Sequence, residues 1–353
     1  MRHGPSNTRD RAGEHGLIDA IRARVPVPPP WLVVGIGDDA AVAAPERGAL
    51  EILTTDALVE SVHFDRRLST PGDIGWKALA VNLSDVAAMG GTPRLALLSL
   101  GIPEHVGTAE IEELVDGFLA LAAETGVTLA GGNITRSPGP LIVDVTVTGF
   151  ARPRRVLTRA GGRPGDDLYV TGTIGGAAAG LAWWQHCGPG RVGNALDGAE
   201  SALDSAEGAG IVACVARHRR PEPRVRIGAL LGRNRAASAC MDLSDGLADA
   251  VRQIAAASGT GARVDAELLP VPDGARAWFA RTGADPAIAA AAGGDDYELL
   301  FSVPRRARGR LMTVMQQARG IPITRIGALT REPDVALLRN GAPEPLPFGF
   351  VHF

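Results

Sequence analysis

Carboxylates set among glycines and small apolar residues are the side chains of this sequence best suited to chemistry. They occur in five short motifs, which read GIGDDAAV (35–42), LTTDALVE (53–60), AVNLSDVAAMGG (80–91), MDLSDGL (241–247) and GGDDYELL (293–300). Burying a carboxylate is costly unless a positive group meets it. Five such places in one chain therefore suggest that cations, together with a polyphosphate, join them.

The first two motifs offer oxygen atoms at the ends of predicted strands. Asp38 and Asp39 follow a glycine turn, and a helix N-cap would account for only one of them. Thr54, Thr55 and Asp56 follow the next strand and form a cluster of hard oxygen atoms, which is the ligand type that Mg²⁺ prefers. A turn or a cap would explain that cluster equally well, so the sequence leaves both explanations open there.

Asp85 is the carboxylate that structural roles explain least. It lies three residues after Asn82 in a predicted helix, so the two side chains share one face, and their neighbours are apolar. A solvated helix face would carry more charge than this one, and a core helix would not carry an aspartate. The pattern therefore favours a functional role for Asp85.

The remaining motifs lie between predicted strands and helices. Asp242, Ser244 and Asp245 follow a short apolar strand, and capping of the next helix would account for one of the three side chains. GGDDYELL again combines glycines, paired acids and a strand, which a turn into an edge strand also explains. Residues 131–140 read GGNITRSPGP and form a predicted loop, whose glycines would allow the backbone to approach a phosphate.

Several chemistries are excluded by the residues that the sequence lacks. Lys77 is the only lysine and no Gly-Lys-Ser/Thr sequence surrounds it, so this is not a P-loop protein, and the protein-kinase signatures are missing. No Cys-x-x-Cys or His-Glu-x-x-His motif occurs, which argues against a zinc site. His63 is the only histidine near an acidic motif, and a surface position is the simpler explanation for it.

Composition indicates the general class of the protein. A length of 353 residues suits two domains, and 45% hydrophobic residues suffice for their cores. The formal net charge of −3 gives no support to a nucleic acid as partner. No apolar run approaches the roughly 20 residues of a membrane span, and the N-terminus does not resemble a signal peptide. Together with three scattered cysteines, these features predict a cytoplasmic protein without a membrane partner.

The first half of the chain is expected to mix strands and helices as an α/β or α+β domain. We predict a disordered lead over residues 1–13, a first domain over 14–151 and a second domain over 152–353. The boundary falls in a stretch rich in Arg, Gly and Pro. The predicted elements of the first domain are helices over 17–25, 74–89 and 108–125 and strands over 31–34, 49–54, 94–100, 127–130 and 141–150.

The second half continues the alternation on either side of a predicted loop. Residues 188–210 are rich in Gly and Ala with little periodicity, and we predict a loop or a variable insertion there. The predicted elements are strands over 167–171, 262–265, 297–303 and 323–329 and helices over 175–184, 243–257 and 306–319. In this arrangement the acidic motifs lie beside strand ends or inside a helix, where a fold can bring them together.

The order of the motifs resembles that of the thiamine-monophosphate kinase family, in the superfamily of aminoimidazole ribonucleotide synthetase and selenophosphate synthetase. The resemblance runs from about residue 30 to the final GFVHF and includes GGNITR, LTRAGGRPGD and VTGTIGGAAAGL. It implies an N-terminal α/β domain, whose sheet pairs with a second subunit to form a β-barrel across a homodimer, and a C-terminal α+β domain. It also implies that ATP phosphorylates thiamine monophosphate to thiamine diphosphate, with the nucleotide in the cleft between the domains.

The same resemblance implies roles for individual residues. The ligands of several Mg²⁺ ions would be Asp39, Thr54, Thr55, Asp56, Asp85, Asn133, Asp242 and Asp245. Contacts to ATP would come from Gly132, Asn133, Arg159 and Ser244, and contacts to the thiamine substrate from His63, Asp295 and either Phe348 or Phe350. At two positions the chain departs from the residues common in the family, with Asn133 in place of Asp and Asp295 in place of Glu.

The acceptor in such a reaction is itself a phosphate, whose oxygen is ionised at neutral pH, so the transfer needs no general base. We therefore expect direct in-line transfer assisted by Mg²⁺, with Arg159 as a charge stabiliser. Two alternatives remain open, namely another ATP-using enzyme of the superfamily and a nucleotide-binding member without turnover, with Asn133 as its lesion. Selenophosphate synthetase and the carbamoyl dehydratase of hydrogenase maturation fit less well, because residues 1–186 contain no cysteine and the chain ends in GFVHF.

Overall fold

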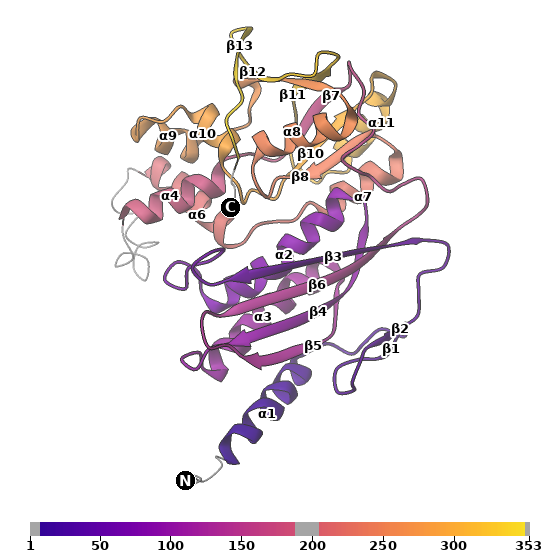
Figure 1. Cartoon of the computed structure of the whole chain (residues 1–353), viewed down its shortest axis with the longest axis vertical. Coiled ribbons are helices and arrows are strands. Elements are labelled where there is room, and N and C mark those ends of the chain that lie inside the picture. Colours follow the sequence, from indigo (N-terminus) through magenta and orange to yellow (C-terminus); the bar gives the residue numbers. More distant parts are fainter. Residues whose placement is uncertain (1–7, 188–204, 350–353) are drawn as a thin grey trace.

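The computed structural model describes residues 8–187 and 205–349, and its first half is built around one four-stranded sheet (Figure 1). The strands lie in the order β3 (Leu50–Val59), β6 (Ile142–Ala151), β4 (Thr92–Ile102) and β5 (Thr128–Arg136). Neighbouring strands are antiparallel except for β4 and β5, which are parallel. Helices α2 (Pro71–Ala88) and α3 (Thr108–Thr125) pack on one face of this sheet.

Burial along β6 alternates with the period of a strand that is covered on one face. Val143, Val145 and Val147 are fully buried in the core formed with α2 and α3, whereas Asp144 and Thr146 point to the other face and are only half-buried. The second face of the sheet is thus left partly open to solvent in the single chain.

Helix α2 connects the two halves of the molecule and is buried along most of its length. It begins with a capping box, in which Thr70 and Asp73 each accept a hydrogen bond from the other's backbone N–H, and Pro71 occupies its first turn. It packs on α3 and β3 in its own half and on α7 (Val225–Asn234) and β8 (Ala239–Asp242) in the other half. The helix thereby brings the motif that contains Asp85 to the junction of the two halves.

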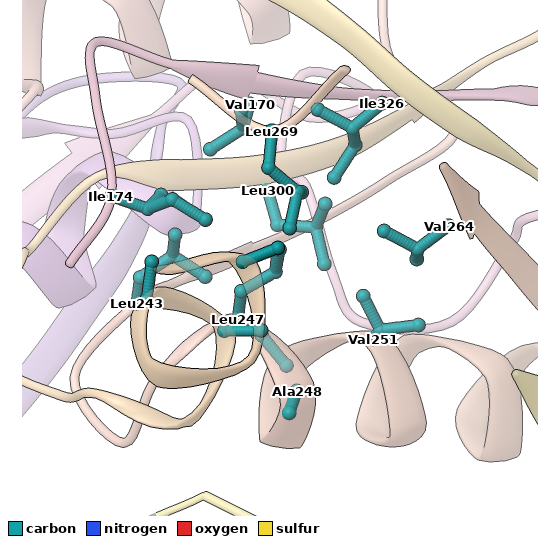
Figure 2. Packing of buried hydrophobic residues seen from close by; sticks show 14 of the residues in the cluster. Val170, Ile174, Leu243, Leu247, Ala248, Val251, Val264, Leu269, Leu300 and Ile326 are labelled. Atoms are coloured by element: carbon teal, nitrogen blue, oxygen red, sulfur yellow. The ribbon is translucent and has the colours of Figure 1, made fainter. Parts of the chain in front are cut away.

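The second half contains a seven-stranded sheet with helices packed against it. Its strand order is β13 (Ala342–Pro345), β12 (Val335–Arg339), β9 (Gly261–Asp265), β11 (Ile323–Thr330), β7 (Asp167–Thr171), β10 (Leu299–Val303) and β8. The helices are α4 (Gly176–Cys187), α6 (Ser205–Arg219), α7, α8 (Leu247–Ser258), α9 (Asp273–Arg281), α10 (Pro286–Ala292) and α11 (Arg308–Gln316), with the 3₁₀ turns η2 (Ala266–Leu268) and η3 (Arg305–Ala307). Figure 2 shows its core, where Leu247 and Val251 of α8 pack with Val264 and Leu300 of the sheet.

Helix α1 (Thr8–Arg24) begins earlier than the sequence indicated. It includes residues 8–13, which are therefore helical rather than disordered, and residues 1–7 lie outside the described part of the chain. Two short antiparallel strands follow, β1 (Leu32–Val34) and β2 (Val42–Ala43), and the GIGDD motif lies between them.

Two predictions for the first sheet were wrong about where strands end. GGNITR is not a loop, because β5 continues through Arg136 and pairs with β4 along its length. Strand β3 continues to Val59, so Thr54, Thr55 and Asp56 lie inside the strand rather than at its end. Adjacent residues of this cluster therefore point to opposite faces of the sheet.

The second half also differs from the sequence-based expectation. Helix α8 begins at Leu247, because residues 243–246 form an irregular connection. Helix α6 begins at Ser205, inside the predicted loop over 188–210, and residues 188–204 lie outside the described part. The sequence patterns did not indicate α7, α9, α10, β12 or β13. No helix within the described ranges is both long and apolar enough to cross a lipid bilayer.

Candidate active site

Two cavities lie between the halves of the molecule and meet at two carboxylates. The larger has a volume of about 680 Å³ and is lined by the end of β3 and the following turn, by α4, and by Asp242, Ser244, Asp245, Gly293, Gly294, Asp295 and Tyr297. The smaller has a volume of about 420 Å³, lies between β3, α2 and β8, and has Arg159 in its wall. Asp85 and Asp242 line both cavities, so a group held at these two residues can be reached from either side.

Three carboxylates gather at this junction from separate elements, namely Asp56 from β3, Asp85 from α2 and Asp242 from β8. The Thr54 hydroxyl donates to Asp85 Oδ2 at 2.5 Å, and the Ser84 hydroxyl donates to Asp242 Oδ2 at 2.8 Å. Asp242 is only 4% exposed. The two hydroxyls orient the carboxylates in the cleft without neutralising them.

The pKa values of Asp56 and Asp242 indicate that negative charge accumulates at this junction. Burial, followed by the charges of Asp85 and Asp242, raises the pKa of Asp56 to about 7. Burial, followed by the charge of Asp85, raises the pKa of Asp242 to about 7 as well. Within the residues that the structure describes, no ion pair joins a lysine, arginine or histidine to any of the three. A bound cation would offset this negative charge.

The donor set fits a hard cation such as Mg²⁺, because it consists of carboxylate and hydroxyl oxygens. In the described part of the chain, no group of three or more His, Cys, Asp or Glu side chains is arranged to hold a metal ion by itself. Mg²⁺ in phosphoryl-transfer sites usually takes one or two carboxylates and completes its shell with water and substrate phosphates. The arrangement fits that kind of shared site rather than a closed protein cage.

His63 lies in the turn after β3 and forms part of the wall of the larger cavity. The backbone N–H of Val59 donates to His63 Nδ1 at 3.0 Å. A neutral imidazole whose Nδ1 accepts a hydrogen bond carries its proton on Nε2, so His63 can donate from that atom. The turn thus fixes His63 as a hydrogen-bond donor, which suits an anionic ligand.

Asp295 lines the larger cavity from the other half of the molecule. Its backbone has a φ of +66°, which is uncommon for a residue other than glycine, and its N–H donates to the Ser244 carbonyl at 2.8 Å. The Lys77 ammonium donates to Asp295 Oδ2 at 2.9 Å, and the Tyr297 hydroxyl donates to Oδ1 at 3.0 Å. Burial opposes ionisation of this carboxyl, but the Lys77 ammonium beside it holds its pKa below the usual range.

The other two acids of GGDDYELL do not line the cavity. Asp296 accepts hydrogen bonds from two backbone N–H groups where α4 begins. Glu298 is fully buried and pairs with Arg217 and Arg224. These partners satisfy both acids within the second half, so their role is to stabilise the loop that carries Asp295.

Asp39 and Asn133 do not reach the carboxylate cluster within one chain. Asn133 lies on β5, and the three strand spacings that separate β5 from β3 amount to about 14 Å. Asp39 follows Gly35, whose Cβ position lies 3.9 Å from the Ala130 carbonyl oxygen of β5. Asn133 is therefore at the edge of the sheet opposite to Asp56, and Asp39 belongs to the β1–β2 connection, which Figure 1 shows beside that edge.

Three further predicted residues each line one cavity, although Ser244, which was predicted to contact ATP, lines the larger cavity and not the smaller. Ser244 and Asp245 follow β8 and line the larger cavity. Arg159 lines the smaller cavity, where its guanidinium donates to Gln253 Oε1. Trp184 and other residues of α4 complete the wall of the larger cavity and give it an apolar side.

Of the remaining predicted residues, Thr55, Gly132 and Phe348 line neither cavity. Thr55 is on the face of β3 opposite to Thr54, and its hydroxyl contacts Asp144. Gly132 lies on β5 beside Asn133. Phe348 is 82% exposed and packs against an arginine, and Phe350 lies outside the described residues.

Lys77, His218 and Tyr297 belong to the site although the motifs did not reveal them. Lys77, Val81 and Asp85 are spaced four residues apart on α2, so they lie along one face of the helix. A single lysine in an otherwise apolar helix, on the same face as Asp85, is the signal that could have indicated Lys77. His218 stands in a basic run, which carried no comparable signal.

Two family models match the chain on either side of the cleft. One is AIR synthase related protein, N-terminal domain, over residues 37–151, and the other is AIR synthase related protein, C-terminal domain, over residues 163–339. The thiamine-monophosphate kinase of Escherichia coli (strain K12) is 39% identical over 345 residues, which cover 97% of this chain and 98% of the relative. The thiamine-monophosphate kinase of Bacillus subtilis (strain 168) is 36% identical over 297 residues, which cover 83% of this chain and 84% of the relative.

Solved structures show the same likeness over both halves. Thiamine-monophosphate kinase from Stenotrophomonas maltophilia K279a is 38% identical, with a TM-score of 0.78, and the match covers 92% of this chain and 96% of that chain. AaThiL complexed with AMPPCP and TMP is 30% identical, with a TM-score of 0.73, and the match covers 100% of this chain and 99% of that chain. The chain therefore belongs to the thiamine-monophosphate kinase family, within the AIR synthase related proteins.

Proposed function

We propose that this chain transfers the γ-phosphoryl group of ATP to thiamine monophosphate (TMP), forming ADP and thiamine diphosphate. The observation that carries the proposal is the meeting of two cavities at Asp85 and Asp242. A phosphoryl donor in the smaller cavity and an acceptor in the larger one would face each other at these carboxylates. Membership of the family supports the assignment, and one related structure holds AMPPCP together with TMP.

Each cavity has residues suited to one of the two substrates. In the larger cavity, His63 would donate from Nε2 to the acceptor, and Asp295 would face it from the opposite wall. In the smaller cavity, Arg159 would contact the phosphates of ATP. Because the acceptor phosphate is already ionised at neutral pH, no side chain has to remove a proton. The residues therefore act by binding and aligning the two substrates for direct in-line transfer.

Mg²⁺ is the proposed cofactor. Asp56, Asp85 and Asp242 would hold it together with Thr54, and Asp245 would extend this set. When bound, Mg²⁺ offsets the repulsion between the two phosphate groups that must approach each other. The raised pKa values of Asp56 and Asp242 support the proposal, because they reflect burial and repulsion between the carboxylates, which a bound cation would offset.

A homodimer is the proposed assembly, with the open face of the four-stranded sheet as its interface. Leu53 and Leu97 on that face are 68% and 37% exposed, and burying such side chains is favourable. Two sheets of this kind would form the β-barrel that the sequence resemblance implies. Because Asp39 and Asn133 lie at the far edge of the sheet in their own chain, we infer that they serve the cleft of the partner.

A cytoplasmic location is also proposed, since Cys187, Cys214 and Cys240 are unpaired, as is usual in a reducing compartment. The division into domains over 14–151 and 152–353 is proposed from the sequence. The two family models lie on either side of that boundary, which supports it.

Measurement of ADP release tests the proposed function. With Mg²⁺ and ATP, the wild type should release ADP in the presence of TMP but not of thiamine. Asp85→Ala should lower kcat at least about 10²-fold, which is the scale of lost electrostatic stabilisation at a transition state. Asp116→Ala, at an exposed position on α3, is the control and should leave the rate unchanged.

Three outcomes would contradict parts of the proposal. ATP binding without ADP release would indicate a nucleotide-binding protein without turnover. Near wild-type turnover in Asp85→Ala would exclude the role of that carboxylate. A phosphorylated aspartate or histidine on the quenched enzyme would exclude direct transfer.

A further inference from the structure

Lys77 is the only lysine of the chain, and its side chain is 3% exposed. Burying an ammonium group is strongly unfavourable unless its partners satisfy it. Lys77 lies on α2, one helical turn before Val81 and two turns before Asp85, both of which line the larger cavity. Lys77 itself does not line the cavity, so any effect that it has on a ligand there passes through the lining residues that it contacts.

The ammonium group of Lys77 makes two contacts with that wall. It donates to Asp295 Oδ2 at 2.9 Å and to the backbone carbonyl of His63 at 3.3 Å. His63 belongs to the turn after β3 in the first half, whereas Asp295 belongs to the loop before β10 in the second half. One buried cation therefore joins the two residues that are proposed to contact TMP from opposite walls.

The other groups around Asp295 all come from its own half of the molecule. The Tyr297 hydroxyl donates to Oδ1 at 3.0 Å, and His218 Nδ1 lies 3.4 Å from Oδ2. Burial, followed by the charge of Lys77, lowers the pKa of His218 to about 3, so His218 is neutral. Among these side-chain contacts, Lys77 alone connects Asp295 to the first half.

We propose that Lys77 is a positioning residue, which clamps the His63 turn to the Asp295 loop and so sets the distance between the two walls that hold TMP. The inference rests on the proposed function, because it takes the larger cavity as the TMP site. Backbone conformation supports it, since Ser61, Asp295 and Tyr297 have φ values of +67°, +66° and +50°. Residues other than glycine keep such conformations only when their surroundings fix them.

The clamp acts on the acceptor side of the cleft. Neither His63 nor Asp295 lines the smaller cavity, which is the proposed ATP site. Loss of Lys77 should therefore weaken the binding of TMP and leave the binding of ATP unchanged. A general loss of stability would not separate the two substrates in this way.

Lys77→Met tests the clamp, because it keeps an unbranched apolar stem but removes the charge and the donor. We expect KM for TMP to rise at least about tenfold, as the loss of charge-assisted hydrogen bonds predicts, with less than about twofold change in KM for ATP and in kcat. Calorimetric titration with TMP should show the same weakening without turnover. Turnover by the wild-type protein, measured in the same series, tests the proposed function independently of the role of Lys77.

Arg219→Met is the matched control. Arg219 of α6 pairs with Asp73 at the start of α2, so it also joins the two halves through a buried carboxylate, and it lines neither cavity. This variant should lower Tm and leave KM for TMP unchanged. An equal rise of KM for TMP in both variants would overturn the proposal, because loss of any ion pair between the halves would then have the same effect.

A second pair of variants, both carrying Asp295→Asn, tests the proposal if Lys77→Met alone does not fold. Asp295→Asn leaves the Lys77 ammonium unpaired, and adding Lys77→Met removes that buried charge, so the double variant should have the higher Tm. It should nevertheless bind TMP at least about threefold more weakly than Asp295→Asn alone, because the His63 carbonyl has lost its donor. Equal or tighter TMP binding in the double variant would overturn the proposal. The proposal would also be overturned if Lys77→Met folds and its KM for TMP stays within about twofold of the wild-type value.

Discussion

The pKa of a buried carboxylate in this chain depends on the balance between burial, which raises it, and protein cations and N–H donors, which lower it. Burial and neighbouring carboxylates raise the pKa of both Asp56 and Asp242 to about 7. Asp73 is 4% exposed, and burial opposes its ionisation, but the Thr70 backbone N–H and two consecutive arginines hold its pKa below the usual range. Asp73 is thus held by two arginines of the fold, whereas Asp56 and Asp242 line a cavity.

Asp73→Asn should therefore destabilise the fold at neutral pH but not in acid. Asparagine keeps an acceptor for the capping box while it removes the charge that meets Arg219 and Arg220. Because the pKa of Asp73 is lower in the folded chain than its unperturbed value of 3.8, its contribution is present above that value and is lost as the pH falls from there through the lower pKa of the folded state. Urea unfolding should show a loss of about 2 kcal/mol at pH 7, which shrinks between about pH 5 and pH 3. A loss of constant size over that range would contradict the ion-pair explanation.

Residues of the site could be predicted when their immediate neighbours in the sequence showed their environment. Asp85 and Asp242 are such residues, because small apolar neighbours mark a carboxylate that solvent exposure does not explain. The contact of Lys77 with Asp295 could not be predicted, because the two residues lie 218 positions apart and only folding brings them together. Glu298 belongs to an acidic motif as well, yet Arg217 and Arg224 neutralise it, and nothing in its local sequence shows this.

At the scale of elements, the contact between α2 and α3 depends on small residues. A Cβ on Gly75 of α2 would lie 1.8 Å from the Leu114 carbonyl oxygen of α3. A Cβ on Gly117 of α3 would lie 1.9 Å from the Gly72 carbonyl oxygen. The two backbones touch directly at these glycines, and this contact holds α2, and with it Asp85, against the sheet.

Gly75→Ala is expected to destabilise the protein by about 2–3 kcal/mol, because a backbone carbonyl cannot move aside as a flexible side chain could. Gly16→Ala is the control, since Gly16 is exposed on α1 with nothing within 4 Å of an added methyl group. It should stabilise the protein by about 0.5–1 kcal/mol, which is the usual preference of helices for alanine over glycine. Urea unfolding of the two variants measures the difference, and equal stabilities would show that α2 and α3 can separate without cost.

Elements could be predicted where the hydrophobic period is clear, as in α3 and β6, whose observed bounds lie close to the predicted ones. The end of β5 could not be predicted from the sequence, because Gly131, Gly132 and Asn133 are typical turn residues. In the structure, a Cβ on Gly132 would lie 1.8 Å from the Leu98 carbonyl oxygen of β4. This glycine therefore serves close packing between strands, a tertiary reason that no local pattern contains.

At the scale of the whole molecule, the first sheet separates two groups of proposed metal ligands. Asp56 lies at its β3 edge beside the cleft, whereas Asp39 and Asn133 lie at its β5 edge. A barrel of two such sheets whose two-fold axis runs along the barrel would place the β5 edge of one subunit beside the β3 edge of the other. The two groups would then meet across the subunit interface, which is a geometry that the sequence of one chain does not contain.

Mixing two inactive variants tests this arrangement. Asp39→Ala and Asp85→Ala should each lower the rate of their homodimers at least about 10²-fold. If Asp39 serves the partner's cleft, a mixed dimer has one cleft with both lesions and one with none, so random pairing restores about a quarter of the wild-type rate. The control mixes Asp39→Ala with Asn133→Ala, where every cleft of a mixed dimer keeps one lesion and no activity returns. If Asp39 instead serves the cleft of its own chain, the first mixture also stays inactive, and the proposed interface loses its catalytic role.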